Sequence, residues 1–180
     1  MKKSLGLWSF VGFVVTLSLG SILHFLYEWT NESIIVAPFS AINESTWEHM
    51  KILFFPMFLF AIVESFFLAK EYPEFWSIKL VSISLGLILI PVIFYTYNGI
   101  FGRPPDFVNI LIFAIADAII YLYEFHALKS HKKQKLSQTV SFILLAIISI
   151  LFMVFTFKTP NLPIFLDPTA LTIFFSAVVN

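Results

Sequence analysis

The chain has 180 residues, of which 59% are hydrophobic and only 12% are charged, with a mean hydropathy of +0.91. Water-soluble domains average about 45–50% apolar and about 25% charged residues. The composition therefore excludes a soluble globular domain, a disordered chain and a nucleic-acid-binding protein, and indicates one integral membrane domain over residues 1–180. The 11 basic and 11 acidic residues cancel, and the absence of cysteine excludes disulfides and thiolate metal sites.

Five apolar segments are long enough to cross a bilayer, whose core of about 30 Å takes roughly 20 helical residues. A chain in lipid has to satisfy its own backbone hydrogen bonds, so each segment is expected to be a helix. The fold predicted from these segments is an all-α, polytopic transmembrane helix bundle. Its five predicted spans are Leu5–Tyr27, Thr46–Ala69, Trp76–Asn98, Phe107–His126 and Thr139–Phe157.

The lysines and the single arginine divide unevenly between the two sides of these spans. Cytoplasmic loops carry an excess of basic residues, which predicts an N-terminus inside the cell and a C-terminus outside. The last 12 residues, Thr169–Asn180, would cover only about 18 Å as a helix and are predicted to form a short cap on the outer surface. The inner side would hold Lys2, Lys3, Lys70, Lys79, Lys129, Lys132, Lys133 and Lys135, and the outer side Lys51, Arg103 and Lys158.

Histidines and carboxylates gather where the first predicted span ends and the second begins. His24 and Glu28 are four residues apart and share one helical face, and Glu44, Glu48 and His49 follow across the first loop. Carboxylates four residues apart repel each other unless a positive charge lies between them. The five residues therefore predict an outward-facing site for a cation or a small cationic ligand. His24, Glu28, Glu48 and His49 could hold a divalent metal such as zinc.

A structural role for the same segment is an open alternative. Ser45-x-x-Glu48 matches a capping box at the start of a helix, and Asn43 is an equally suitable N-cap residue. An acidic residue in a first helical turn also complements the helix dipole. Glu48 could in addition pair with Lys51, three residues further along.

Three further carboxyl groups lie inside the predicted spans. Asp117 is near the middle of the fourth span, with Tyr121 and Glu124 on the same helical face, and Glu64 lies in the inner half of the second. Buried carboxylates are costly in a membrane and commonly mark ion or proton pathways, so these four residues could form an intramembrane polar path. Alternatively, the carboxyls are protonated and only join helices together.

The run Asn43-Glu44-Ser45-Thr46-Trp47-Glu48-His49, with His24-x-x-x-Glu28 before it and the proline-rich stretch 163–168 after it, resembles a family of small bacterial membrane proteins. That family is of unknown function, so the resemblance implies no catalytic residues. It implies a multi-pass protein of the bacterial cytoplasmic membrane and covers nearly the whole chain.

Three functions remain open at this point. The preferred one is transport or ligand binding at the outward-facing His/Glu site, with the first loop and the C-terminal tail as lids. The second is a metal-dependent intramembrane hydrolase, which needs three metal ligands and a further glutamate to activate water. The third is a non-catalytic partner subunit in the lipid bilayer, and a short chain of this kind could also form a homo-oligomer.

Overall fold

The structure is a computed structural model that describes residues 2–102 and 106–167. Five helices, each long and apolar enough to cross a membrane, make up most of these residues, and no strand occurs in the described ranges. They are α1 (Lys2–Trp29), α2 (Thr46–Leu68), α3 (Phe75–Phe101), α4 (Asp106–Lys129) and α5 (Gln138–Phe157), followed by the short 3₁₀ helix η1 (Pro163–Phe165). The prediction of a five-span helical bundle is confirmed, and no helix end differs from its predicted position by more than three residues.

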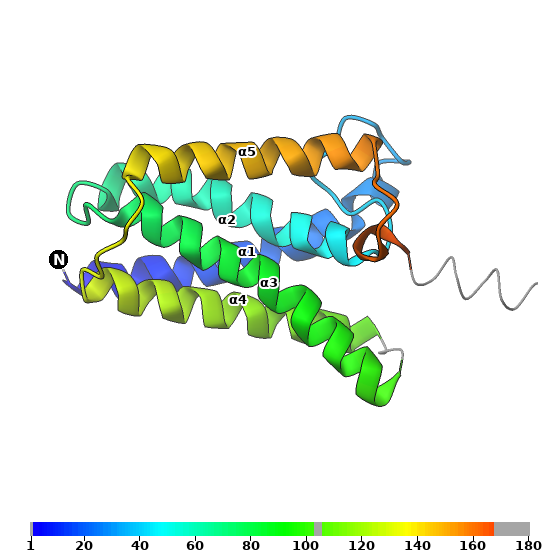
Figure 1. The fold of residues 1–180 in the computed structure, drawn as a ribbon, viewed down its shortest axis with the longest axis horizontal. Coiled ribbons are helices and arrows are strands. Elements are labelled where there is room, and N and C mark those ends of the chain that lie inside the picture. The colour runs from blue at the N-terminus through cyan, green and yellow to red at the C-terminus, as the bar shows by residue number, and fades with distance from the viewer. Residues whose placement is uncertain (1, 103–105, 168–180) are drawn as a thin grey trace, which may run out of the picture.

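Successive helices run antiparallel, and the first four form a closed ring (Figure 1). Each of α1 to α4 packs against the next, and α4 packs back against α1. Helix α5 lies outside this ring, mainly against α3 and to a smaller extent against α2. The interior of the ring is therefore the place where side chains of four helices meet.

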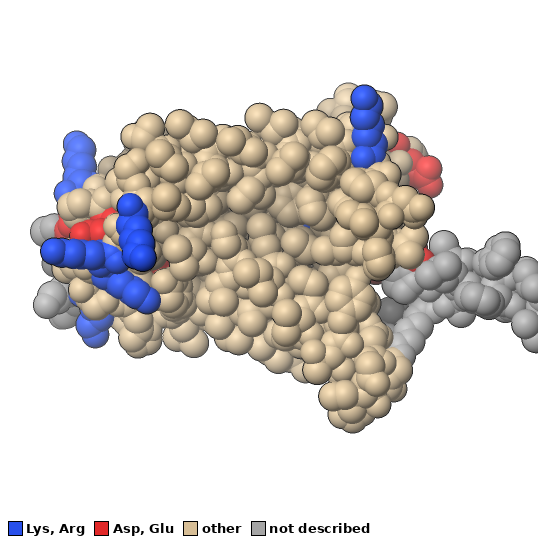
Figure 2. All heavy atoms as spheres, viewed as in Figure 1, with Lys and Arg blue, Asp and Glu red and all other residues tan. Residues whose placement is uncertain are grey.

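The two ends of the bundle differ in character. One end, here called the basic end, has the start of α1 and the connections after α2 and α4, with Lys70, Lys129, Lys132, Lys133 and Lys135. The opposite end, here called the site end, has the long loop 30–45 and the segment after α5. Figure 2 shows blue lysines gathered at the basic end and a side face without charged residues between the two ends. Such an uncharged belt is what contact with lipid requires.

Small residues on α1 allow α4 to approach it closely. A Cβ atom at Gly12 would lie 2.4 Å from the ring of Tyr121, and one at Gly20 would lie 2.4 Å from the ring of Phe113. Between them, the hydroxyl of Thr16 hydrogen-bonds to that of Tyr121 at 2.9 Å. Small residues spaced four apart are a common basis of helix packing in membranes, where close backbone approach replaces the hydrophobic effect as the driving force.

The site end is covered by loop 30–45 and by η1. The Ala41 N–H donates to the Leu23 carbonyl at 3.1 Å, so the loop folds back onto α1. Phe165 of η1 packs on Trp47 of α2, with ring centroids 4.6 Å apart. The described part of the tail thus covers this end of the bundle, whereas the apolar run 169–180, for which the outer cap was predicted, lies outside the described residues.

Candidate metal centre

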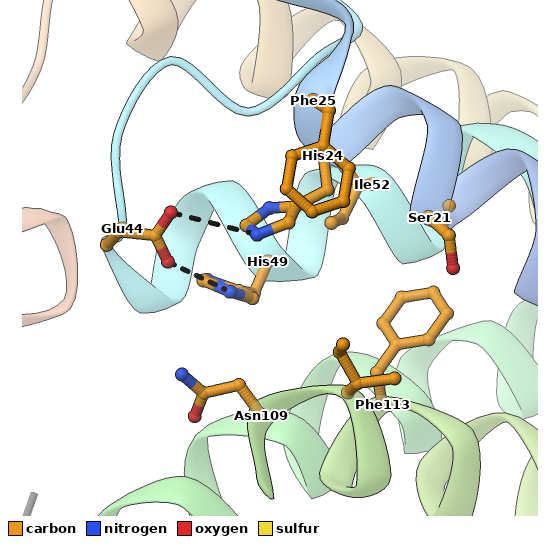
Figure 3. Close-up of a pocket in the computed structure, with 10 residues that line it drawn as sticks. Ser21, His24, Phe25, Glu44, His49, Ile52, Asn109 and Phe113 are labelled. Atoms are coloured by element: carbon orange, nitrogen blue, oxygen red, sulfur yellow. Dashed lines mark ion pairs between the residues drawn. The ribbon is translucent and has the colours of Figure 1, made fainter. Parts of the chain in front are cut away.

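Three of the predicted site residues meet at the site end, each from a different element (Figure 3). His24 comes from α1, Glu44 from the loop and His49 from α2. One Glu44 oxygen lies 3.7 Å from His24 Nε2, and the other lies 3.7 Å from His49 Nε2. One ligand atom of each residue lies within 4.8 Å of the other two, which brings three groups of the kind that hold metals into one place.

The local sequence before α2 explains how Glu44 and His49 come to face each other. The Asn43 side-chain oxygen accepts a hydrogen bond from the Ser45 N–H at 2.9 Å, which closes a tight turn around Glu44. Ser45 then caps α2, because its hydroxyl accepts from the Glu48 N–H at 3.4 Å. His49 follows in the first turn of the helix, on the side where Glu44 enters.

The imidazole of His49 is oriented by a backbone hydrogen bond. Its Nδ1 lies 2.9 Å from the Ser45 carbonyl oxygen. A carbonyl can only accept, so Nδ1 carries the proton and the lone pair of Nε2 points toward Glu44. Metal-binding histidines commonly donate their second ring N–H in this way, because the bond fixes both tautomer and ring direction.

The spacing of the three groups fits a metal better than it fits direct contact. A separation of 3.7 Å is too long for a hydrogen bond between the carboxylate and either ring. Ligand atoms about 2.0 Å from a tetrahedral zinc ion lie about 3.3 Å from one another. The two 3.7 Å distances involve different Glu44 oxygens, and one ligand atom of each residue lies within 4.8 Å of the other two, so the ligands would have to close by up to about 1.5 Å around one ion.

A cavity of about 410 Å³ adjoins the three side chains. Besides them, its walls include Ser21 and Phe25 of α1 and Asn109 and Phe113 of α4. The side-chain oxygen of Asn109, Oδ1, is buried and has no hydrogen-bond partner among the described residues. With three potential ligands on one side and this oxygen across the cavity, a fourth coordination position would be open to a water or a ligand.

Glu28 and Glu48, two of the four residues that the sequence suggested as metal ligands, lie apart from the group, whereas Glu44, predicted only for the wider cation site, belongs to it. Glu48 is buried against Lys51, with 2.5 Å between Oε2 and Nζ, and it also accepts from the Ile42 N–H at 3.1 Å. Lys51 Nζ in turn donates to the Ala37 carbonyl and to the Thr156 hydroxyl, both at 2.9 Å. This ion pair and the helix cap give Glu48 the structural role that the alternative interpretation described. Glu28 is exposed and is not among the three grouped side chains.

The carboxyls predicted for an intramembrane path are buried. Two of them pair with the same lysine, a contact that was not predicted from the sequence. Lys79 of α3 forms ion pairs with both Glu64 of α2 and Glu124 of α4, and all three side chains are about 1% exposed or less. Asp117 is fully buried, and neither of its oxygens has a hydrogen-bond partner in the described part of the chain. The sequence feature that could have indicated these ion pairs is the position of Lys79 inside the third apolar span, at the same depth as two carboxylates.

Comparisons with known proteins identify a family but no characterised relative. A search of curated proteins and a search of solved structures each found no match. The model of a family of unknown function, DUF6512, matches residues 1–172. This range includes the candidate centre and the buried ionic cluster of Lys79, Glu64 and Glu124. This agrees with the expected membership of an uncharacterised family. The chain belongs to the family of unknown function DUF6512.

Proposed function

We propose that this membrane protein binds a divalent transition metal such as zinc through His24, Glu44 and His49. The observation that carries the proposal is the convergence of two imidazoles and one carboxylate on a space with no direct bond between them. Two nitrogen ligands and one oxygen ligand form a donor set typical of zinc sites that keep a position open. The orienting bond from His49 to the Ser45 carbonyl adds support, because it leaves Nε2 available to a metal.

A metal suits the group better than an organic cation does. The candidate ligand atoms lie within 4.8 Å of one another, a volume that holds a single ion. Imidazole nitrogen is also a better ligand for zinc and its neighbours than for alkali or alkaline-earth ions, which prefer oxygen.

Metal binding is favoured over metal-dependent hydrolysis. A hydrolase would need a further carboxylate near the metal to activate water. Among the described residues that line the cavity, Glu44 is the only acidic one, and it is itself a proposed ligand. Glu48 does not line the cavity, and its Oε2 contacts Lys51 and the Ile42 N–H.

The distribution of lysines supports an outward-facing site. Because positive residues favour the cytoplasmic side, the basic end would lie inside a bacterial cell and the candidate centre outside. Loop 30–45 would act as a lid in this arrangement, since Glu44 belongs to the segment that connects it to α2. A metal arriving from outside would thus meet its ligands at the membrane surface.

Elemental analysis of the purified protein in detergent tests the proposal. The four histidines provide matched variants, with two at the candidate centre and two exposed at the basic end, His126 and His131. We expect one zinc ion per wild-type chain, loss of that ion in His24→Ala/His49→Ala, and its retention in His126→Ala/His131→Ala. Equal zinc content in the two double variants would contradict the proposal.

A further inference from the structure

A line of polar residues follows α4 through the interior of the helix ring. Asn109, Asp117, Tyr121 and Glu124 lie on the same side of this helix, which faces the ring of α1, α2 and α3. Asn109 borders the cavity at the site end, and Glu124 belongs to the ionic cluster near the basic end. The line therefore connects the two ends of the bundle through the depth of the membrane.

Asp117 is the unusual member of this line. It lies about 16–18 Å along the axis from either end of α4, which places it near the middle of the bilayer. It is fully buried, and both oxygens lack a partner among the residues that the structure describes. An unpaired carboxylate at this depth would cost several kcal/mol, which favours the neutral, protonated form of Asp117. A carboxyl that only joined helices would instead be bonded to a neighbour.

The ionic cluster near the basic end can accept a proton. With Lys79 charged and both Glu64 and Glu124 ionised, the cluster carries one net negative charge. The second oxygen of Glu124 is buried and has no partner in the described ranges, so it has a free lone pair. Glu124 lies about 10 Å along α4 from Asp117. Tyr121 lies between them, with its ring 5.6 Å from Lys79 Nζ.

Phe113 lies on α4 between the cavity and Asp117. Phe113 lies one helical turn from both Asn109 and Asp117, and its ring points from α4 toward Ser21 of α1 in Figure 3. The ring packs against Gly20, where any side chain would collide with it. A connection between the cavity and Asp117 would require this ring to move.

Lys79 determines which cation such a path could conduct. Its ammonium group already pairs with both carboxylates of the inner end, so a divalent metal would have to displace it in order to pass. A proton meets no such obstacle, because it moves as the acid hydrogen of a carboxyl from Asp117 to Glu124. The groups beyond Phe113 are therefore suited to protons and not to the metal.

We propose that the line from the cavity to Glu124 is a proton pathway, with Asp117 as the proton-binding group at mid-membrane. A metal bound at the candidate centre would inhibit proton entry into this pathway. In each transfer Asp117 gives its proton to Glu124 through intervening water, Glu124 releases that proton to water at the basic end, and Asp117 is reprotonated from water in the cavity after Phe113 moves. A divalent cation at His24, Glu44 and His49 would hinder entry of protons to the cavity by repulsion. Only this last part, the closing by metal, rests on the proposed function.

Proton uptake into liposomes tests the pathway. The full chain is reconstituted with a pH-sensitive dye inside, and a potassium gradient with valinomycin drives protons inward. We expect uptake faster than in protein-free liposomes, and a fall to the protein-free rate in Asp117→Asn, which removes the acid group at nearly constant volume. Glu32→Gln, a change of an exposed loop carboxylate, is the control and should behave as wild type. Wild-type uptake at the protein-free rate, or uptake in Asp117→Asn equal to wild type, would overturn the pathway.

A chemical probe covers the case in which Asp117→Asn does not fold. Dicyclohexylcarbodiimide reacts with protonated carboxyls in apolar surroundings, and mass spectrometry locates the modified residue. Modification of Asp117 in the reconstituted wild type should abolish uptake, and undiminished uptake after its modification would overturn the pathway.

Zinc separates this inference from the proposed function. With zinc on both sides of the membrane, wild-type uptake should slow, and His24→Ala/His49→Ala should slow less relative to its own zinc-free rate. Absence of zinc binding in detergent would contradict the proposed metal site. The proton pathway would still be tested by the uptake experiment in liposomes. Zinc binding without any effect on proton uptake would contradict only the inhibition of the pathway by bound metal.

Discussion

The two ends of the bundle each hold a group of ionisable side chains, but the two groups are built differently. Near the basic end, Lys79 bonds directly to Glu64 and Glu124, and all three are shielded from solvent. At the site end, Glu44 remains 3.7 Å from His24 and from His49, and the Glu44 side chain is 40% exposed. Groups that satisfy one another hold helices together, whereas groups held just out of contact can still take up an ion.

Glu48 and Glu44 show the same contrast within a single turn of chain. Glu48 is tied to Lys51, which also holds the Ala37 carbonyl and the Thr156 hydroxyl, so one buried ion pair joins α2, the loop and α5. Glu44, four residues earlier, has no such partner and faces the two imidazoles instead. Proximity to the candidate centre alone therefore does not make a carboxylate part of it.

The largest effect is expected where the buried ionic cluster is broken. Lys79→Met would leave two carboxylates buried without a cation, which we expect to lower the free energy of unfolding by about 3–5 kcal/mol. Unfolding in detergent micelles measures this, with the exposed Lys133→Met as the control. A Lys79→Met protein as stable as wild type would show that the cluster does not hold α2, α3 and α4 together.

The second test adds the metal and compares the two neighbouring glutamates. At a free zinc concentration about 100 times the dissociation constant, binding should raise the free energy of unfolding by about 2.7 kcal/mol. Glu44→Gln should lose most of this gain because a ligand is gone. Glu48→Gln should start from a lower stability, since Lys51 loses its counter-ion, yet still gain from zinc. Equal zinc effects in the two variants would remove the distinction between them.

The spans could be predicted well from the sequence, and the partners inside the bundle could not. Hydropathy locates a helix because lipid demands an apolar exterior, so all five spans were found with ends within three residues. Lys79 and Lys51 were assigned to opposite membrane surfaces by position. Both are buried, and burial depends on which helices pack together.

The candidate centre shows the same limit. The spacing of His24, Glu44 and His49 predicts that they reach one membrane face, because α1 and α2 are antiparallel neighbours. The sequence does not show that Glu44 joins the group while Glu28 and Glu48 stay outside it. That choice depends on the fold of loop 30–45 and on Lys51. Asn109, from the distant α4, had no signal beyond its position near the start of a span.

A third, smaller effect tests the close approach that holds Phe113 between the two regions. A methyl group at Gly20 would collide with the Phe113 ring, so Gly20→Ala should cost about 1–3 kcal/mol of unfolding free energy. Gly99→Ala is the matched control, because no atom lies within 4 Å of a Cβ at that exposed position. There the exchange should be neutral or stabilise by up to about 1 kcal/mol. A Gly20→Ala protein as stable as Gly99→Ala would show that the contact with Phe113 tolerates a methyl group.

The smallest expected effect compares the two serine caps, one at each end of the bundle. Ser45 caps α2 at the site end, and Ser137 caps α5 at the basic end by accepting from the Val140 N–H at 3.2 Å. Replacing either serine by alanine should lower the free energy of unfolding by about 1 kcal/mol, since each loses one cap hydrogen bond. Only Ser45→Ala should also weaken zinc binding, measured by calorimetry, because a frayed first turn of α2 would release the Ser45 carbonyl that orients His49. If Ser137→Ala weakened zinc binding equally, the centre would depend on overall stability and not on the local turn that brings Glu44 to the histidines.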